Sequence, residues 1–452
     1  MSDLGQGDAG KSRRIWGWFF YFWAAQPYFT LLLTFIFAPY VVDLVGKGTT
    51  AQAIWGYGIS AYGLIVAISA PFLGAIADKA GGRKRFIAVF SIFYVLGAWG
   101  LWYGAPGQFS LGFLMLSFGL GLIATEISAM FANAMLVDLG DRSELGRISG
   151  SAWGFGYIGG VVSLVIMLLF FAEQHSGRTL IGLAPGFGLL DATAREGTRA
   201  VGPFTALWFI VFSLPFFLWT RDPRRPGAAS IGEAVRSAWP DLRATLSRLP
   251  ANRNLMLFLI ASMLYRDALN GIFTFGGIYA SGVLGWSVVN VGIFGILAAI
   301  TGAVFAWLGG KADSAYGPKV VIIVGLIVLT GVACGTLVLS RTSVFGIAVG
   351  PKSALPDITF YVMGALIGAC AGSLQAASRT MMVLQANPER MTEAFGLYAL
   401  AGQATSFIAP FAIAVATDAT GSQQAGIAPL IVLFVAGFVM LLFVRTPRDA
   451  RA

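Results

Sequence analysis

The sequence has very few of the residues from which metal sites, disulfides and catalytic triads are built. Among its 452 residues are 2 cysteines and 1 histidine, and only 11% of the residues are charged. Cys334 and Cys370 both lie in apolar stretches, which argues against a disulfide framework or a cysteine metal site. The lone His175 excludes most histidine-based metal and triad chemistry. We therefore expect no metal, no cofactor and no enzymatic activity.

The chain is rich in hydrophobic residues. Hydrophobic residues make up 57% of it, and the mean hydropathy is +0.77, so a soluble surface of ordinary polarity is excluded. A helix of about 20 apolar residues crosses the hydrocarbon core of a bilayer, and the alternating pattern of a membrane barrel is missing. Pro215 interrupts the short apolar run that is predicted to form the sixth span. We predict an all-α membrane protein with twelve transmembrane helices in two six-helix pseudo-repeats, near 16–42, 55–77, 86–104, 110–137, 147–171, 204–219, 254–283, 287–309, 320–339, 358–385, 392–416 and 427–444.

These spans divide the chain into two bundles with a linker between them. In the linker, apolar residues recur at helical spacing from Ile231 to Leu249, which favours an amphipathic helix on the membrane surface; a solvated spacer is the alternative. The predicted parts are a disordered cytoplasmic tail 1–15, an N-terminal bundle 16–219, a cytoplasmic linker 220–253, a C-terminal bundle 254–444 and a cytoplasmic tail 445–452.

Basic residues are distributed unevenly between the two sides of the predicted bundle. Of the 30 Lys and Arg, 22 fall in the termini and the loops on their side, 6 lie on the opposite side and 2 lie within spans. Positively charged loops stay in the cytoplasm, so both termini are predicted to be cytoplasmic. We expect a monomer integral to a bacterial inner membrane. The net charge of +9 then reflects contact with an anionic leaflet rather than with nucleic acid.

Two nucleotide-binding motifs occur in the sequence in the wrong context. The letters from Gly5 to Ser12 match a phosphate-binding loop, which requires a preceding strand, and only four residues precede them. The letters from Gly154 to Gly159 match a dinucleotide fingerprint, but they lie inside an apolar span, where small residues let helices pack closely. Nucleotide binding is therefore not expected.

A short loop motif occurs once in each half of the chain. Gly74 and Asp78 end the second span and are followed by a tight turn and basic residues. Gly309 and Asp313 repeat this arrangement at the eighth span, 235 residues later. Parallel repeats of this kind build the major facilitator transporters, and the whole chain resembles that superfamily.

Other segments resemble one branch of the superfamily, which contains the autophagy-related vacuolar amino-acid effluxers and bacterial relatives of unknown substrate. The segments are Asn133-Ala134, 146–160, 265–267, 375–379 and 393–400. The resemblance implies movement of a small solute by alternating access, and export of an amino acid in particular. The chain departs from the branch in two spans: the first has Phe22-Trp23-Ala24-Ala25 in place of an acidic residue and an asparagine, and the eleventh has Gln403 in place of a lysine.

Few charges remain inside the spans. Glu126 in the fourth span, and Arg266 and Asp267 in the seventh, would each cost about 2.5–3.5 kcal/mol facing lipid, so we expect them to face a cavity or a partner. Asn133 follows Glu126, and Asn270 follows Asp267, at helical spacing. One hypothesis is that Asp267 or Glu126 carries a proton across, with a Glu126–Arg266 pair between the halves; the alternative is a static network that fixes helix packing.

The resemblance places the first, fourth, seventh and tenth spans around a central cavity. It also implies that Asp78 meets a helix N-terminus in the opposite half; a simple helix C-terminal turn is the alternative. The expected gating residues are Gly74, Asp78, Arg83, Arg147, Gly309 and Asp313. The candidates for binding the solute or coupling its movement are Trp23, Gln26, Tyr28, Glu126, Asn133, Tyr265, Arg266, Asp267, Asn270, Arg379 and Gln403.

These observations together predict a secondary active transporter. We expect a small-molecule substrate, coupling to protons and efflux of an amino acid or related metabolite. A membrane scaffold or assembly factor that does not transport, and a transporter of lipids, peptides or drugs, remain as alternatives.

Overall fold

The structure, a computed structural model, describes residues 2–80, 82–135, 138–139, 142–174, 176–220, 232–233, 236, 239–240, 253–385, 398, 401–402 and 405–445. Within these residues, ten helices are long and apolar enough to cross a membrane. Two shorter apolar helices, Gly154–Phe170 and Ile408–Thr420, stand where the fifth and eleventh spans were predicted. The prediction of an all-helical membrane protein is confirmed.

The chain forms two compact units. The first comprises Met1–Phe37 and Ile68–Ala244, and the second comprises Ala38–Ala67 and Thr245–Ala452. The first part of α3 (Gly48–Ala80) therefore groups with the C-terminal helices rather than with the N-terminal ones. The linker helix predicted over 231–249 lies mostly outside the described residues, although Trp239 stacks on Phe72 at 5.9 Å.

In the part of the first unit that the structure describes, one π-helix and six α-helices accompany its part of α3. Helix α1 extends back to Ser2, so the segment predicted to be a disordered tail is helical. Pro215 lies inside the continuous helix α8, and the sixth predicted span is confirmed as a helix long and apolar enough to cross a membrane. The elements are α1 (Ser2–Pro27), the π-helix η1 (Tyr28–Phe35), α4 (Arg83–Gly100), α5 (Leu111–Ala134), α6 (Arg142–Phe170), α7 (Glu196–Arg199) and α8 (Val201–Trp219), with the short 3-10 turns η2 (Leu101–Tyr103) and η4 (Pro185–Gly188).

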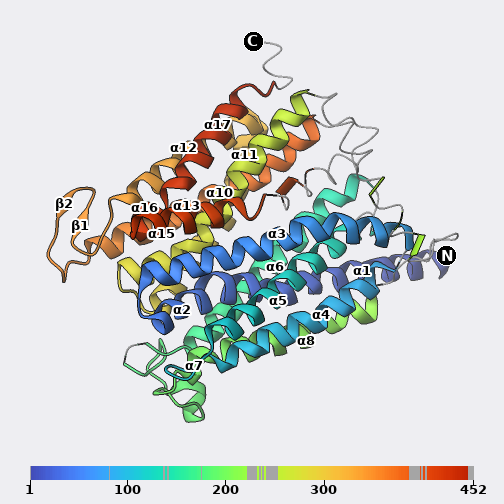
Figure 1. Cartoon of the computed structure of the whole chain (residues 1–452). Helices are drawn as coiled ribbons and strands as arrows, with labels where there is room; N and C mark the ends of the chain where they lie inside the picture. The colour runs from blue at the N-terminus through green and yellow to red at the C-terminus, as the bar shows by residue number, and fades with distance from the viewer. Residues whose placement is uncertain are drawn as a thin grey trace. The chain divides into compact units, whose positions relative to one another are not determined.

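Aromatic side chains hold the first unit together. Helix α1 packs against both α6 and α8 (Figure 1), and the Trp23 ring lies 4.6 Å from the ring of Phe155 and 5.9 Å from that of Trp208. Tyr94 of α4 stacks on Phe209 of α8 at 4.0 Å. Such ring pairs add about 0.5–1.5 kcal/mol each beyond the burial of their surface.

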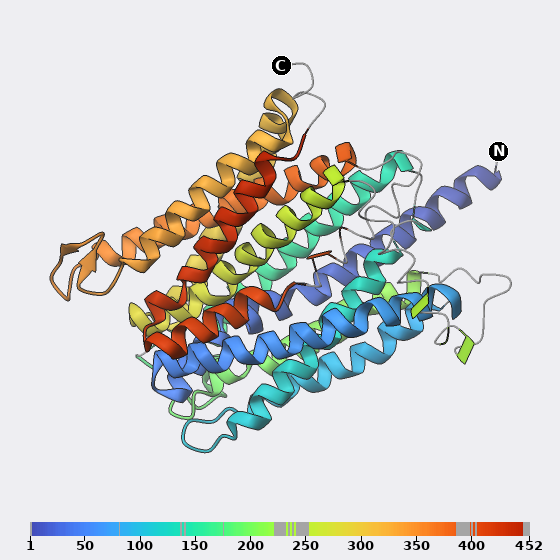
Figure 2. The ribbon, with the colours of Figure 1, turned by 45° about the horizontal axis from the view of Figure 1, so that its top comes forward.

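The second unit is built on a close pair of helices, α11 and α13. The elements of this unit are α2 (Phe37–Val45), the start of α3, α10 (Arg253–Val283), α11 (Val288–Tyr316), α12 (Pro318–Leu337), α13 (Leu355–Gln385), α15 (Ile408–Thr420), α16 (Gln423–Gly426) and α17 (Ala428–Leu442). Figure 2 shows α11 and α13 side by side. A Cβ atom on Gly368 of α13 would collide with the carbonyl oxygen of Ala298 of α11, so the two backbones touch there. Glycine is required for this approach, as at other contacts between membrane helices.

A small hairpin joins α12 to α13. Its strands β1 (Ser343–Val344) and β2 (Ile347–Ala348) are antiparallel, with Ser343 opposite Ala348. Phe345 and Gly346 form the turn, both with positive φ, as a two-residue hairpin loop of matching twist requires. The hairpin projects beyond the ends of α12 and α13, at the left of Figure 1.

The loop between α6 and α7 contains a buried ion pair. Arg195 Nε donates to Glu173 Oε1 at 2.9 Å, and Glu173 is 1% exposed. Burial raises the pKa of Glu173, and the nearby Arg195 charge only partly offsets this effect. Arg199 lies 4.7 Å above the Trp102 ring and donates to the Trp102 carbonyl oxygen. The loop is therefore anchored to the helix ends beside it.

Candidate functional site

The eleventh predicted span is not one continuous helix. It was expected over 392–416, but residues 405–407 form a turn and α15 begins only at Ile408. Upstream of this turn, residues 401–402 are helical, while Gln403 lies outside the described residues. A helix N-terminus therefore lies inside an apolar span. Its first N–H groups have no partner within the helix and attract a negative charge.

Asp267 of α10 supplies that negative charge. Its Oδ2 accepts a hydrogen bond from the backbone N–H of Ala409 at 2.8 Å, in the first turn of α15. The side chain is 3% exposed, and its other oxygen, Oδ1, is buried without a hydrogen-bond partner among the described residues. Asp267 is thus tied by one oxygen to the start of a half-helix, and its second oxygen is available to hold a proton.

Arg266 contacts the segment before the break. Its guanidinium lies 4.4 Å above the ring of Tyr398, and Nη1 donates to the Tyr398 carbonyl oxygen at 3.4 Å. A side chain on Gly402 would contact the guanidinium at about 2.9 Å, so the arginine packs directly on that backbone. Neighbours in a helix point about 100° apart. Arg266 and Asp267 therefore reach the two sides of one break in the eleventh span.

The other candidate residues of the seventh and tenth spans differ in how deeply they are buried near Arg266 and Asp267. Tyr265 is fully buried, and its hydroxyl is 2.8 Å from Ser378 Oγ of α13. Arg379, the next residue, is half-buried. Asn270, expected on the same face as Asp267, is exposed. Asp267 and Asn270 therefore do not form a common buried stripe.

In the first unit the predicted aromatic residues pack helices together. Tyr28 is fully buried, and its hydroxyl donates to the Phe118 carbonyl oxygen at 2.6 Å. Trp23 is enclosed by rings of α6 and α8, as described above. Gln26 lies against Gly160 of α6. In this conformation Trp23 and Tyr28 contribute to packing instead of lining a cavity.

The two polar candidates of α5 are more accessible. Glu126 is half-buried and Asn133 is exposed. The hypothesis that Glu126 pairs with Arg266 stays a prediction.

The expected gating residues of the first unit are only partly described. Gly74 lies in α3 opposite Met130, while the side chains of Asp78 and Arg147 are outside the described residues. Arg83 is 9% exposed and pairs with Asp138 at 3.2 Å, which the sequence did not single out.

In the second unit, the repeated motif ends α11. Gly309 packs closely on Ser373 of α13. Asp313 accepts the N–H of Gly317 on its backbone oxygen at 2.7 Å, which closes the last turn of the helix. Both residues thus have visible roles in helix packing and helix termination.

A buried cluster of uncharged polar residues, which the sequence reading missed, joins α3 to the helices after the break. Gln52 Nε2 donates to Thr417 Oγ1 at 2.6 Å, and Gln423 Nε2 donates to Gln52 Oε1 at 3.2 Å. Gln52 and Thr417 are fully buried and Gln423 is 5% exposed. Further along α3, Ser60 Oγ donates to the carbonyl oxygen of Phe407, the residue that precedes α15. We call Gln52, Thr417 and Gln423 the glutamine clasp.

The spans, the paired loop motifs and the broken helix together define a class of protein. Solved structures of the same fold include a mutant form of the nucleoside transporter NupG, with a TM-score of 0.62 and 15% identity, covering 94% of this chain and 99% of that one. A D-xylose-proton symporter has a TM-score of 0.65 at 12% identity, covering 96% of each chain. The chain therefore has the fold of the major facilitator transporters.

Sequence comparison gives the family within that class. The model of the family described as vacuole effluxer Atg22 like matches residues 38–452, and the chain belongs to this family. It is 26% identical over 436 residues to the uncharacterized MFS-type transporter YxiO of Bacillus subtilis (strain 168), covering 94% of both chains. It is 24% identical over 326 residues to autophagy-related protein 22 of Coccidioides immitis (strain RS), covering 68% of this chain and 50% of that one. The chain spans about half the length of this fungal relative.

Proposed function

We propose that this protein is a proton-coupled secondary active transporter that exports an amino acid or a related metabolite. The observation that carries the proposal is the position of Asp267, a buried carboxyl group in a membrane span that binds the N-terminus of the half-helix α15. In transporters, discontinuous helices of this kind form the sites for substrates and coupling ions near the middle of the membrane.

The proton acts through the contact between Asp267 and Ala409. An ionised carboxylate is attracted by the positive end of α15 and accepts the Ala409 N–H strongly. Protonation removes the charge, weakens this hydrogen bond and releases α15 to move against α10. A proton taken up on one side and released on the other thereby changes which arrangement of α10 and α15 is favoured. Glu126 is the second carboxyl group that we assign to coupling.

The glutamine clasp supplies a contact that opens and closes in each cycle. Its hydrogen bonds are neutral, and each contributes about 0.5–1.5 kcal/mol. Gln52 makes one bond to Thr417 and accepts one from Gln423, so the clasp as a whole contributes a few kcal/mol. The binding of substrate and proton can supply the few kcal/mol of free energy that are needed to open the clasp. A buried ion pair in the same place would be harder to break.

Arg266 and the carboxyl groups favour a zwitterionic substrate. Arg266 can bind a carboxylate, and Glu126 or Asp267 can bind an ammonium group. The name of the matched family, a vacuole effluxer, favours export. We assign the protein to a bacterial inner membrane as a monomer with both termini in the cytoplasm.

The experiment is efflux from proteoliposomes loaded with a mixture of labelled amino acids, with and without an imposed pH gradient. Gradient-dependent release of one or more amino acids is the expected result. A correctly folded protein that releases none of them would reject amino acids as the substrate class. The same vesicles loaded with peptides, drugs or labelled lipids would then be compared.

A further inference from the structure

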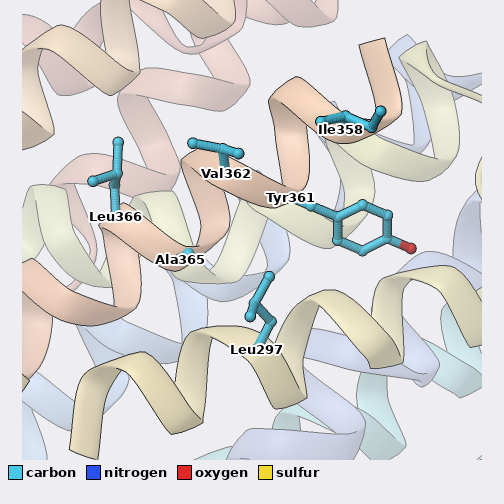
Figure 3. A pocket seen from close by; sticks show the side chains of 6 residues that line it. All are labelled: Leu297, Ile358, Tyr361, Val362, Ala365 and Leu366. Carbon is cyan, nitrogen blue, oxygen red and sulfur yellow. The ribbon is translucent and has the colours of Figure 1, made fainter. Parts of the chain in front are cut away.

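A groove runs between α11 and α13 on the surface of the second unit (Figure 3). Its volume is about 410 Å³, and it is lined by Leu297 of α11 and by Ile358, Tyr361, Val362, Ala365 and Leu366 of α13. Ile358, Val362 and Leu366 are 56%, 54% and 41% exposed. Both helices are membrane spans, so these exposed apolar side chains face lipid.

The groove offers hydrocarbon and no free polar group. Among the six lining residues only Tyr361 has a polar side-chain atom, and its hydroxyl donates to the carbonyl oxygen of Asn290 at 3.3 Å. A polar solute would lose its hydration there without gaining a hydrogen bond. An alkyl chain loses nothing by entering.

The length of the groove matches one leaflet of a bilayer. Its lining on α13 extends from Ile358 to Leu366, which at about 1.5 Å per residue is roughly 12 Å. One leaflet contributes half of a hydrocarbon core about 30 Å thick. The groove is therefore deep enough for most of one acyl chain that enters from the nearer membrane surface.

A charged cluster lies at the end of α13 from which the groove starts. Asp357, next to Ile358, accepts hydrogen bonds from Arg341 Nη1 at 2.6 Å and from Trp286 Nε1 at 2.5 Å. The Trp286 ring in turn stacks on the ring of Tyr361 at 4.5 Å. Direct contacts thus connect the charged cluster to the lining of the groove.

The cluster carries unused positive charge. Arg341 also donates from Nε to Pro351 O and from Nη2 to Ser353 O. Three of its five N–H groups are thus engaged, which leaves two without a partner among the described residues. The Arg341 side chain is 33% exposed, and Lys352 is exposed beside it. Two cations against one carboxylate favour an anion such as a phosphate diester.

We propose that this groove binds one phospholipid, with an acyl chain between α11 and α13 and its phosphate at Arg341 and Lys352. Phospholipid is favoured over a second copy of the chain because the apolar groove and the cationic cluster adjoin each other. A phospholipid has the same arrangement, with an apolar acyl chain joined to a charged phosphate. Charge-assisted hydrogen bonds from the Arg341 guanidinium and the Lys352 ammonium group would hold the phosphate at this membrane surface.

The test is native mass spectrometry of the purified full chain, titrated with palmitoyl-oleoyl-phosphatidylglycerol in detergent. The wild type should retain one lipid above the statistical background. Ala365→Phe, which fills the groove, and Arg341→Gln should each reduce lipid retention roughly tenfold. A tenfold loss of affinity has about the same free energy as the burial of two methylene groups of an acyl chain. Ile327→Phe, at a 58% exposed position of α12, is the matched control and should retain the lipid as the wild type does.

Oleate and inorganic phosphate serve as partial probes, since each has only one of the two features. Both should bind much more weakly than the phospholipid. Equal retention by Ala365→Phe, or equal binding of oleate, would overturn the proposal. A dimer lost in Ala365→Phe would instead assign the groove to self-association. A diazirine-labelled acyl chain in vesicles tests the wild type without any substitution: cross-links in 355–366 support the site, and cross-links only elsewhere reject it.

Discussion

Replacing Asp267 by asparagine separates the charge of this residue from its shape. The asparagine side chain keeps an oxygen that can accept the Ala409 N–H, which Asp267 Oδ2 accepts at 2.8 Å in the wild type. What the variant loses is the negative charge and the ability to exchange a proton. A transporter that couples through Asp267 should therefore fold and bind substrate but fail to use a pH gradient.

The stability of the variant can be worked out from the same contact. A hydrogen bond to a charged group contributes about 1.5–3 kcal/mol and a neutral one about 0.5–1.5 kcal/mol, so Asp267→Asn loses roughly 1–2 kcal/mol there. The interaction of the charge with the helix terminus adds up to about 2 kcal/mol to that loss. The loss is offset because an ionised carboxylate no longer has to be buried. Asp267→Ala, in contrast, leaves the Ala409 N–H without its acceptor, at a cost of about 1–3 kcal/mol.

The assay compares two modes of transport in the same proteoliposomes. Exchange of labelled for unlabelled substrate at equal pH needs no net proton movement, whereas accumulation against a gradient does. Asp267→Asn should retain exchange and lose gradient-driven accumulation at least about tenfold, which corresponds to roughly 1.4 kcal/mol of coupling. Ser262→Ala is the control on α10, because Ser262 is buried and, among the described residues, its hydroxyl bonds to the Leu259 carbonyl oxygen of its own helix alone.

Two results would refute the reasoning. Gradient-driven accumulation that is unchanged in Asp267→Asn would remove Asp267 from the coupling path. Loss of exchange together with a fall in thermal stability as large as that of Asp267→Ala would mean that the carboxylate serves only to fix α15 in place.

Three further predictions concern the clasp, the α6–α7 loop and the helix pair of the second unit. Gln423→Ala should leave Gln52 with one hydrogen bond fewer and destabilise the closed clasp by about 1–3 kcal/mol. It should also increase labelling of a cysteine introduced in place of Ala53, the buried neighbour of Gln52 on α3, which leaves Gln52 itself intact. Because burial raises the pKa of Glu173, the folded state binds its proton more tightly than the unfolded one. The wild type should therefore lose stability as the pH rises from below the ordinary value of 4.5 through the raised pKa, and Glu173→Gln should flatten this thermal-stability profile. Gly368→Ala should destabilise the α11–α13 contact by about 1–3 kcal/mol, measured by thermal unfolding in detergent.

Each of these has its own control. Labelling at position 53 should stay unchanged in Gln424→Ala, because the Gln424 side chain bonds to the Leu339 carbonyl oxygen outside the clasp. A stability that rises with pH through the same range in the wild type would show that the ion pair with Arg195 outweighs burial. Gly331→Ala, at a position of α12 with no atom near a new Cβ, should be neutral, and an equal loss there would show that Gly368 has no special role.

The break in the eleventh span has a signal in the sequence that hydropathy does not use. Pro410 stands in the first turn of α15, where a missing N–H costs nothing, and Gly402 lies shortly before the turn. A window of apolar residues averages over such a pair, so the span looked continuous. The glutamine clasp was missed because Gln52 and Gln423 are uncharged and stand just before the second and the twelfth predicted spans. A search for charges inside spans passes over such residues, which are costly to bury only when they lack partners.

The charged candidates for the site could be identified from the sequence because charged residues are rare inside apolar spans. Glu126, Arg266 and Asp267 stand out by composition alone, but the partner of each does not. The backbone N–H of Ala409 lies 142 residues from Asp267 in sequence. No local pattern encodes that distance.

The helical membrane architecture could be predicted without a structure, because the hydropathy and length of each span follow from its own residues. The sequence also shows which residues carry charge into the membrane and where the paired loop motifs recur. The packing roles of Tyr28 and Trp23, and the contact of Asp267 with a helix terminus, could be seen only in the folded chain. These roles depend on contacts between residues far apart in the chain, and such contacts are fixed only when the helices pack.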